Sequence, residues 1–209
     1  RSGRVVGLDR DADVGKAALT DLRAAGHEQC EYVEGDIEAA DPFPDQRFDL
    51  VYGRLVLLHL DDPVAALRRM WGWTAPGGHL VLQDYDMSVV DSDPRLPVLD
   101  EWKRVFFGAY AAAGRSVRLG TRLPGLFAEA GIDGPYDRDV VGRLEPLATT
   151  GPMLTGTFRA VSPLAIRHGL LTEEQRDAWL SDMTTAMRDH GETSMLWPLL
   201  IGVTAHRTS

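Results

Sequence analysis

The sequence predicts an α/β fold: a mostly parallel, Rossmann-like sheet with helices on both faces and an antiparallel strand at the C-terminal edge. Short apolar runs alternate with amphipathic stretches through residues 1–90. Turn and helix-stop signals, such as Gly26 and Pro76-Gly77-Gly78, separate these stretches. Because strand and helix alternate, the strands are expected to run parallel and to be joined by helical crossovers.

Local signals support each element of the first half. Asp11 or Asp13 can cap a helix that runs to about Ala25. Asp62-Pro63 can start another helix, since proline just inside a helix start costs no backbone bond. The apolar face of the first helix is expected to comprise Val14, Ala17, Ala18, Leu22 and Ala25. Expected strands are residues 4–8, 30–33, 48–52 and 80–82, and expected helices are 11–25 and 62–71.

After Asp86 the pattern becomes mainly helical. Thr172 and Gln175 form a capping box that starts the last helix. Expected helices are residues 95–113, 121–130 and 172–190, and expected strands are 139–144 and 196–205, which can pair as an antiparallel edge hairpin. We expect a single domain over 1–209, with a cofactor-binding core at 1–90 and helical cap elements at 91–130 and 150–192.

Composition narrows the class of protein. The chain has 22 Lys and Arg against 31 Asp and Glu, a net charge of −9, whereas a nucleic-acid binder would normally be basic. Cys30 is the only cysteine, so it cannot form an internal disulfide, and no Cys/His spacing suits a metal. No apolar stretch or leader suggests membrane insertion. We therefore expect a cytoplasmic protein without metal, nucleic-acid or membrane partners.

Acidic residues follow the first two predicted strands. In open parallel sheets, ligands bind beyond the carboxyl ends of the strands. Asp9 can accept both hydroxyl protons of a ribose, or it can simply cap a helix. Asp36 can accept from an adenine amino group while Ile37 packs on the ring, although Gly-Asp is also a common turn.

Three segments together resemble the class I S-adenosylmethionine-dependent methyltransferases of the group that modifies small molecules. These are VVGLD at 5–9, the long segment from EGDIEAADPF to LRRM at 34–70, and APGGHLVLQDYD at 75–86. The resemblance implies S-adenosylmethionine as cofactor, with Asp9 on the ribose and Arg10 beside the adenine. It places Asp36 and Ile37 at the adenine edge and face. Gly53, Arg54 and Leu55 would line the methionine part of the cofactor.

One part of the family pattern is absent. The glycine-rich loop that follows the family's first and central strand has no counterpart here, so the chain is expected to start at the second strand. Without the central strand, the sheet would have a gap with unpaired amides. We therefore expect further N-terminal residues in the natural protein, among them principal cofactor contacts.

Catalytic and substrate-binding candidates come from the next strand ends and from the helical half. His59 follows a strand that lines the cofactor and is the first candidate for a general base, although it can instead serve only as a loop hydrogen-bonding residue. The alternative candidates for binding or deprotonating the substrate are Asp84, Tyr85 and Asp86. Neighbouring side chains of a strand point to opposite faces, so the sequence leaves open which of the three faces the site. Two helix faces carry large apolar side chains: Trp102, Phe106 and Tyr110 on one, and Trp179, Met183 and Met187 on the other. These side chains can either pack against other helices or contact a hydrophobic acceptor, and the sequence leaves both roles open.

The sequence therefore predicts methyl transfer to a small-molecule acceptor, a hydroxyl oxygen of a specialised metabolite, by an enzyme that is a candidate homodimer. A nicotinamide-dependent dehydrogenase is an alternative, because Asp9 would also bind a ribose there. A second alternative is a non-methylating, cofactor-binding or pericyclase-like relative, whose binding residues would look the same.

Overall fold

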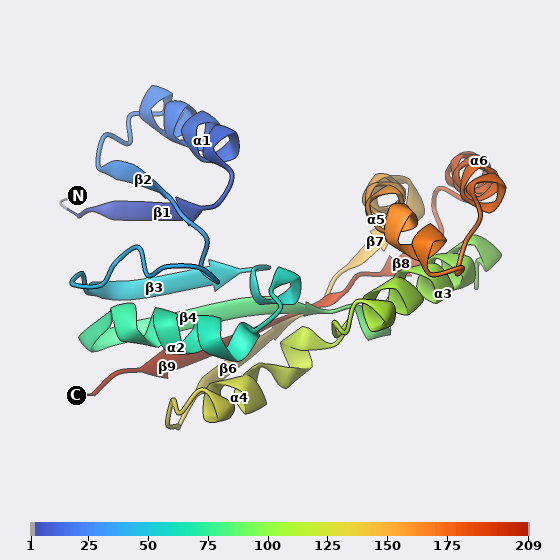
Figure 1. The fold of residues 1–209 in the computed structure, drawn as a ribbon. Helices are drawn as coiled ribbons and strands as arrows, with labels where there is room; N and C mark the ends of the chain where they lie inside the picture. Colours follow the sequence, from blue (N-terminus) through green and yellow to red (C-terminus); the bar gives the residue numbers. More distant parts are fainter. Residues whose placement is uncertain (1–2, 209) are drawn as a thin grey trace.

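The structure is a computed structural model that describes residues 3–208 (Figure 1). It confirms the α/β class. The strands are β1 Val5–Asp9, β2 Cys30–Glu34, β3 Phe48–Arg54, β4 Thr74–Asp86, β5 Asp91–Asp93, β6 Asp137–Val141, β7 Leu144–Pro146, β8 Ser194–Leu196 and β9 Leu199–His206. The helices are α1 Ala12–Ala24, α2 Pro63–Trp73, α3 Pro97–Ala112, α4 Leu119–Glu129, α5 Leu147–Arg167 and α6 Glu173–Asp189, with short 3-10 turns at Leu57–His59 and Met87–Val89.

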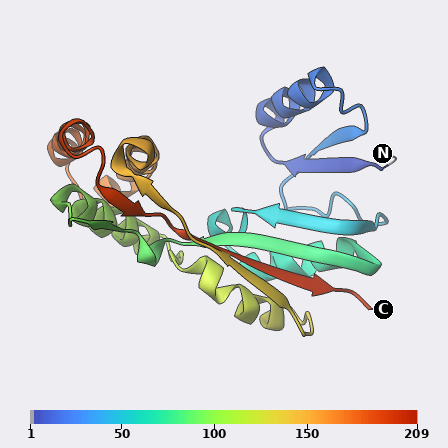
Figure 2. The same ribbon diagram turned by 180° about the vertical axis from the view of Figure 1, so that it is seen from behind.

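The strands of residues 3–208 form three sheets. β1 and β2 pair in parallel, and a four-stranded sheet has the order β3-β4-β9-β6, in which β3 and β4 are parallel and β9 is antiparallel to both its neighbours. A small sheet, β5-β8-β7, lies under the helical part. The arrowheads of β1, β3 and β4 point the same way in Figures 1 and 2. We call the edge where β1 to β4 end the carboxyl edge.

The facing edges of β1 and β3 are unpaired with each other within the described part of the chain. β1 pairs only with β2 and β3 only with β4, so the expected single sheet is divided at this point. Val5, Leu50 and Tyr52 lie along these strands and are 55%, 58% and 53% exposed. Burial of such side chains is normally favourable, so this part of the fold is less well covered than the rest.

One hydrophobic core lies between the four-stranded sheet and the helices α2 and α4. Leu80 and Leu82 of β4 pack there with Leu67 of α2 and with Leu123 and Phe127 of α4, and all are almost fully buried. α2 starts as the sequence predicts, because Pro63 occupies its first turn and the Asp62 carboxylate accepts from the amide of Ala65 at 2.9 Å. This core fixes where β3 and β4 end.

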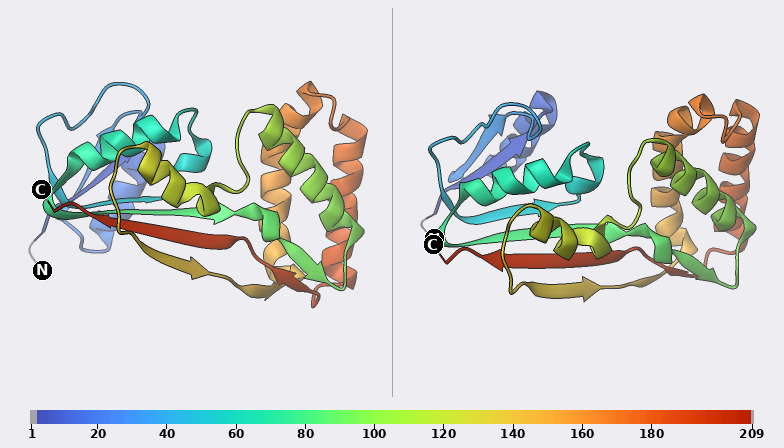
Figure 3. Two further views of the ribbon diagram at one scale, coloured as in Figure 1. Left: turned by 90° about the horizontal axis from the view of Figure 1, so that it is seen from below. Right: turned by 60° about the horizontal axis from the view of Figure 1, so that its bottom comes forward.

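A second core holds the helical part together. Trp102 of α3, Phe158 of α5, and Trp179 and Met183 of α6 are at most 3% exposed, and the Phe158 and Trp179 rings stack at 3.8 Å. Figure 3 shows these three helices as a separate layer at one end of the long strands. We call this layer the helical cap. Trp179 and Met183 are therefore packing residues.

One prediction about helices was incomplete and another was wrong. α5 lies largely within the helical cap elements predicted at 150–192, but no bounds were predicted for it; Pro152 and Pro163 lie inside it and interrupt the usual helical signals. The predicted apolar face of α1 is not buried: Val14 is 56% and Leu22 is 40% exposed. The buried contact of α1 is instead made at Gly15, which faces the ring of Tyr32 in β2.

No helix among residues 3–208 is long and apolar enough to span a bilayer. Within the same residues, no group of three or more His, Cys, Asp or Glu side chains is arranged to hold a metal ion.

Gly15→Ala is expected to destabilise the protein. A β-carbon at Gly15 would lie 2.0 Å from Cε2 of Tyr32, so the ring would have to move. Overpacking of this kind costs about 1–3 kcal/mol, more than the gain in helix propensity of up to about 1 kcal/mol. The control is Gly125→Ala in α4, where nothing lies within 4 Å of the added carbon and a small gain is expected. Urea unfolding of both variants measures the difference; equal stabilisation by both would contradict the packing described here.

Candidate functional site

Asp9 and Asp36 lie at the same edge of the fold. The amide of Gly35 donates to the carbonyl oxygen of Asp9 at 2.9 Å, which brings the ends of β1 and β2 together. One oxygen of each carboxylate serves a local turn: Asp9 accepts from the amide of Asp11, and Asp36 accepts from the amide of Glu38, both at 2.9 Å. The second oxygen of each carboxylate makes no hydrogen bond within residues 3–208. The local turn therefore fixes the orientation of the carboxylate and leaves this oxygen available to a ligand.

Tyr32 supports the loop that carries Asp9. Its hydroxyl lies 3.2 Å from the carbonyl oxygens of both Asp9 and Asp11. Burial, together with the nearby carboxylates of Glu34, Asp9 and Asp11, raises the pKa of Tyr32, so the hydroxyl stays protonated and able to donate. Sequence reasoning missed this residue because the contact crosses from β2 to the loop after β1.

The loop after β2 is tied to the start of α2. The Glu38 carboxylate accepts from the amides of Asp61 and Asp62 at 2.8 and 2.9 Å. Arg69 of α2 donates to the carbonyl oxygens of Ile37 and Ala39. The segment that holds Asp36 and Ile37 is thereby attached to the segment that follows His59.

The end of β3 places its three candidate residues in different surroundings. Gly53 faces the core, where a β-carbon would lie 2.9 Å from Leu82 and 3.0 Å from Met70, so only its backbone can face a ligand. Arg54 is exposed. Leu55 has a φ of 55°, the only non-glycine residue of the described chain with a positive φ, and its amide donates to Gln83 at 2.8 Å. Such a conformation is disfavoured for a branched side chain and is often found at functional sites.

A cavity of about 230 Å³ lies between the carboxyl edge and the helical cap. We call it the cap cavity. Its walls come from the segments after β3 and β4, from α3, from the loop after α3, and from α5. The lining residues are Leu55, Leu58, His59, Tyr85, Met87, Phe106, Tyr110, Ser116, Val117, Met153, Thr157, Ala160 and Val161.

His59 is the candidate base that lines the cap cavity. Partial burial of the ring lowers its pKa, and the positive charges of Arg115 and Arg10 lower it further. The imidazole is therefore neutral at pH 7 and has a lone pair that can accept a proton. Arg10, which follows Asp9 in the sequence, is thus one of the two charges that act on His59.

Asp84, Tyr85 and Asp86 divide as strand alternation requires. Tyr85 lines the cap cavity, whereas Asp84 and Asp86 do not, so the prediction that Asp84 contacts substrate is not supported. Asp84 is 1% exposed and accepts from the amides of Leu58 at 3.2 Å and Tyr85 at 2.9 Å. Burial raises its pKa to about 6, partly offset by these amide hydrogen bonds. Asp84 is a positioning residue for the segment that carries His59.

Asp86 joins the end of β4 to α4. Burial acts to raise the pKa of Asp86, but hydrogen bonds from Ser88 and Thr121 and the charge of Arg118 outweigh it and lower the pKa. The carboxylate therefore stays ionised and bound to its partners. Asp86 thus secures the entry to the helical half of the chain.

The aromatic side chains Trp102, Phe106 and Tyr110 of α3 divide between helix packing and the wall of the cap cavity. Trp102 is fully buried and does not line the cap cavity, which favours the packing role that the sequence left open over contact with substrate. Phe106 stacks on Trp102 at 4.6 Å and on Tyr110 at 4.5 Å. Phe106 and Tyr110 line the cap cavity, so this row of side chains runs from the second core to the cavity wall.

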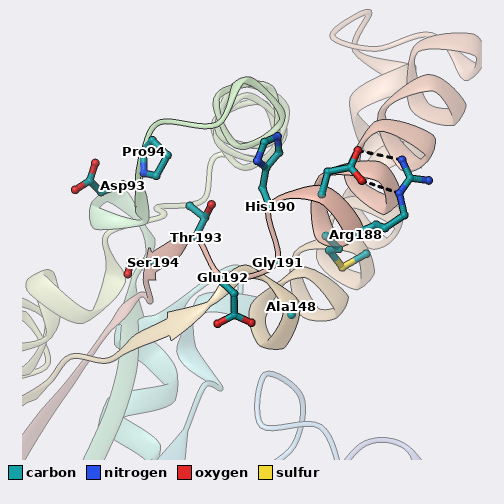
Figure 4. A pocket seen from close by; sticks show the side chains of 11 residues that line it. Asp93, Pro94, Ala148, Arg188, His190, Gly191, Glu192, Thr193 and Ser194 are labelled. Atoms are coloured by element: carbon teal, nitrogen blue, oxygen red, sulfur yellow. Dashed lines mark hydrogen bonds and ion pairs between the residues drawn. The ribbon is translucent and has the colours of Figure 1, made fainter.

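A second hollow lies elsewhere, between β5, α6 and the segment before β8 (Figure 4). Its volume is about 570 Å³, and its lining includes Asp93, His190 and Glu192. Arg188, labelled in Figure 4, forms an ion pair with Asp189 at 2.7 Å on the surface. None of its lining residues comes from the ends of β1 to β4. The cap cavity is therefore the better candidate site.

Comparison with known proteins shows which proteins parts of the chain are similar to. Residues 1–82 match the family model for a methyltransferase domain. Phosphoethanolamine N-methyltransferase 3 of Arabidopsis thaliana is 36% identical over 63 residues, 28% of this chain and 13% of that protein. A ubiquinone/menaquinone biosynthesis C-methyltransferase of Pectobacterium atrosepticum is 29% identical over 144 residues, 63% of this chain and 57% of that protein. The chain thus spans from an eighth to just over half of these relatives.

The fold agrees with these similarities. A solved methyltransferase-like structure from Bacillus halodurans C-125 matches with a TM-score of 0.61 and 19% identity, over 99% of this chain and 84% of that chain. Residues 1–82 therefore carry a methyltransferase domain sequence, and the resemblance to class I methyltransferases drawn from the sequence is confirmed.

Asp84→Asn is expected to change the pH dependence of stability. The folded-state pKa of about 6 lies above the ordinary 3.8, so the stability associated with the protonated carboxyl is present below pH 3.8 and is lost as pH rises through 6. A shift of this size corresponds to about 3 kcal/mol. Unfolding by urea between pH 4.5 and 7.5 should therefore show a smaller loss in the variant than in the wild type.

Asp182→Asn on the exposed surface of α6 is the control for the loss of one negative charge. The free energy of unfolding of this control should depend on pH as steeply as that of the wild type. Parallel curves for all three proteins would refute the assignment of a strained buried carboxylate at Asp84.

Proposed function

We propose that the chain is an S-adenosylmethionine-dependent methyltransferase that acts on a small molecule. The observation that carries the proposal is the arrangement at the carboxyl edge: two oriented carboxylates, Asp9 and Asp36, follow β1 and β2, and an apolar cavity lined by His59 lies beyond the ends of β3 and β4. The match of residues 1–82 to a methyltransferase domain supports it and argues against the nicotinamide-dependent dehydrogenase. We assign residues 1–90 to cofactor binding, and 91–130 and 150–192 to the cap.

The residues at the edge fit the proposed cofactor. The oxygen of Asp9 that the local turn leaves available can accept from the ribose hydroxyls, and that of Asp36 from the purine amino group. Ile37, partly buried and held by Arg69, can pack on the purine face, with Arg10 beside it. The backbone of Gly53, with Arg54 and Leu55, would face the methionine part. When bound, S-adenosylmethionine supplies an electrophilic methyl group on a sulfonium.

The acceptor would occupy the cap cavity with its nucleophilic atom toward His59. A neutral imidazole can take the proton of an acceptor hydroxyl as that oxygen forms its bond to the methyl carbon. Exclusion of water and alignment of the acceptor supply the rest of the rate enhancement. We therefore retain the hydroxyl oxygen as the proposed methylation site, although the relatives named above transfer methyl groups to nitrogen and carbon.

Analysis of the product separates this proposal from the remaining alternative. Labelled methyl groups recovered on an acceptor oxygen would support it. An unmethylated but rearranged product would favour a pericyclase-like relative, and cofactor binding without any product would favour a binding scaffold. Location in the cytoplasm and a homodimer remain part of the proposal, the latter tested by sedimentation equilibrium.

Asp9→Asn and Asp36→Asn are each expected to weaken binding of S-adenosylhomocysteine. Hydrogen bonds to charged groups contribute about 1.5–3 kcal/mol, so the dissociation constant should rise by roughly tenfold to a hundredfold. Isothermal titration calorimetry measures the change, and Asp182→Asn is the control, with wild-type affinity expected. Unchanged affinity in both edge variants would remove the proposed cofactor site.

His59→Gln is expected to lower kcat/KM by roughly a hundredfold to ten-thousandfold while leaving affinity for S-adenosylhomocysteine unchanged. In the wild type the rate should rise with pH through an apparent pKa below the ordinary 6.5, because both the burial and the neighbouring cations of His59 favour the neutral ring. This titration should disappear in the variant. His168→Gln, on the surface after α5, serves as the control. Full turnover by the His59 variant would exclude His59 as the base.

A further inference from the structure

We infer that the methyl acceptor is an uncharged, compact, ring-containing molecule. The inference rests on the proposed function and specifies its substrate class. Its starting point is the lining of the cap cavity, which contains no Asp, Glu, Lys or Arg side chain. A carboxylate, phosphate or ammonium group buried there would lose its hydration without gaining a partner of opposite charge, which costs several kcal/mol.

The two arginines that flank Ser116 and Val117 in the cavity wall are already paired. Arg115 contacts the Asp61 carboxylate at 3.1 Å, and Arg118 lies 3.7 Å from the Asp86 carboxylate. These arginines flank Ser116 and Val117, which belong to the cavity wall. An anionic acceptor that approached either arginine would compete with the carboxylate already bound there. The surroundings of the cavity therefore reinforce its preference for a neutral molecule.

One wall is a rigid aromatic surface. The rings of Phe106 and Tyr110 lie 4.5 Å apart with an angle of 28° between their planes. Trp102 continues the stack and is held in turn by a hydrogen bond from its indole nitrogen to the Thr157 hydroxyl at 3.2 Å. A wall of fixed rings favours a flat partner, because offset stacking and edge contacts require little further ordering.

The cap side of the cavity is mainly apolar. Met153, Ala160 and Val161 line it there, and Tyr110 of α3 and Ser116 of the following loop add hydroxyl groups. The Thr157 hydroxyl is already used, since it accepts from Trp102 and lies 3.0 Å from the carbonyl oxygens of Met153 and Leu154. His59 and Tyr85 supply polar groups from the sheet side. The acceptor would therefore direct its nucleophile to the sheet and its hydrocarbon body to the cap.

The volume of the cap cavity indicates the size of the acceptor. About 230 Å³ is below the range of roughly 300–1,000 Å³ found for pockets that hold drug-sized ligands. One ring or two fused rings suit this space.

Binding of matched naphthalene probes tests the inference. 2-Naphthol, 2-naphthoate and 2-naphthyl phosphate share one ring system and differ in charge at pH 7. Calorimetry with the full chain is expected to give 2-naphthol a dissociation constant at least tenfold lower than either anion. Equal or tighter binding of either anion would overturn the inference, as would the failure of all three to bind.

Variants at Ala160 locate the binding site. Ala160 is an exposed α5 residue on the cavity wall, so a larger side chain there can enter the cavity without disturbing the core. Ala160→Trp should weaken 2-naphthol binding at least tenfold, and Ala160→Lys should reduce the preference for 2-naphthol over 2-naphthyl phosphate at least tenfold. The controls are Ala111→Trp and Ala111→Lys, on an exposed α3 position outside the lining. Equal effects at both positions would place the probe elsewhere and overturn the inference.

A parallel titration with S-adenosylhomocysteine separates this inference from the proposed function. Binding of S-adenosylhomocysteine without selective 2-naphthol binding overturns the acceptor class alone. Selective 2-naphthol binding without S-adenosylhomocysteine binding supports the cavity preference and overturns the methyltransferase proposal.

Discussion

The buried carboxylate of Asp84 is the constraint on which the candidate site depends. It lies at the end of β4 and accepts from the amide of Leu58, in the segment that follows β3. A second link between these strands is the hydrogen bond from the amide of Leu55 to the carbonyl oxygen of Gln83. Together they hold the backbone from Leu55 to His59 in a strained course across the carboxyl edge. The amide hydrogen bonds that the Asp84 carboxylate accepts partly offset the energetic cost of its burial.

This segment is also where the two hydrophobic cores meet. The core under α2 and α4 fixes the strand ends, and the core of α3, α5 and α6 fixes the aromatic wall. Neither core alone encloses the cap cavity, because its lining comes from both. The cap is therefore a structural part of the site, and its packing determines the shape of the space in front of His59.

The site separates its charges from its apolar surface. Carboxylates are gathered at the ends of β1 and β2, whereas the cavity beside them is lined by neutral side chains. Arg10 and Arg115 lie close enough to both regions to lower the pKa of His59. An arrangement of this kind suits a polar nucleoside on one side and a neutral acceptor on the other, with a neutral imidazole at the boundary.

The sequence by itself determined the features that depend on neighbouring residues. The caps at Asp11, Asp62 and Thr172, the strands they follow or precede, and the placement of Asp9 and Asp36 after parallel strands all follow from local patterns. The tertiary structure alone decided what depends on distant contacts: that Tyr85 and not Asp84 faces the cavity, that Trp102 belongs to the core, and that α5 is a helix despite Pro152 and Pro163. The physical reason is that burial and pairing are properties of the surroundings of a side chain, which residues far away in the sequence provide.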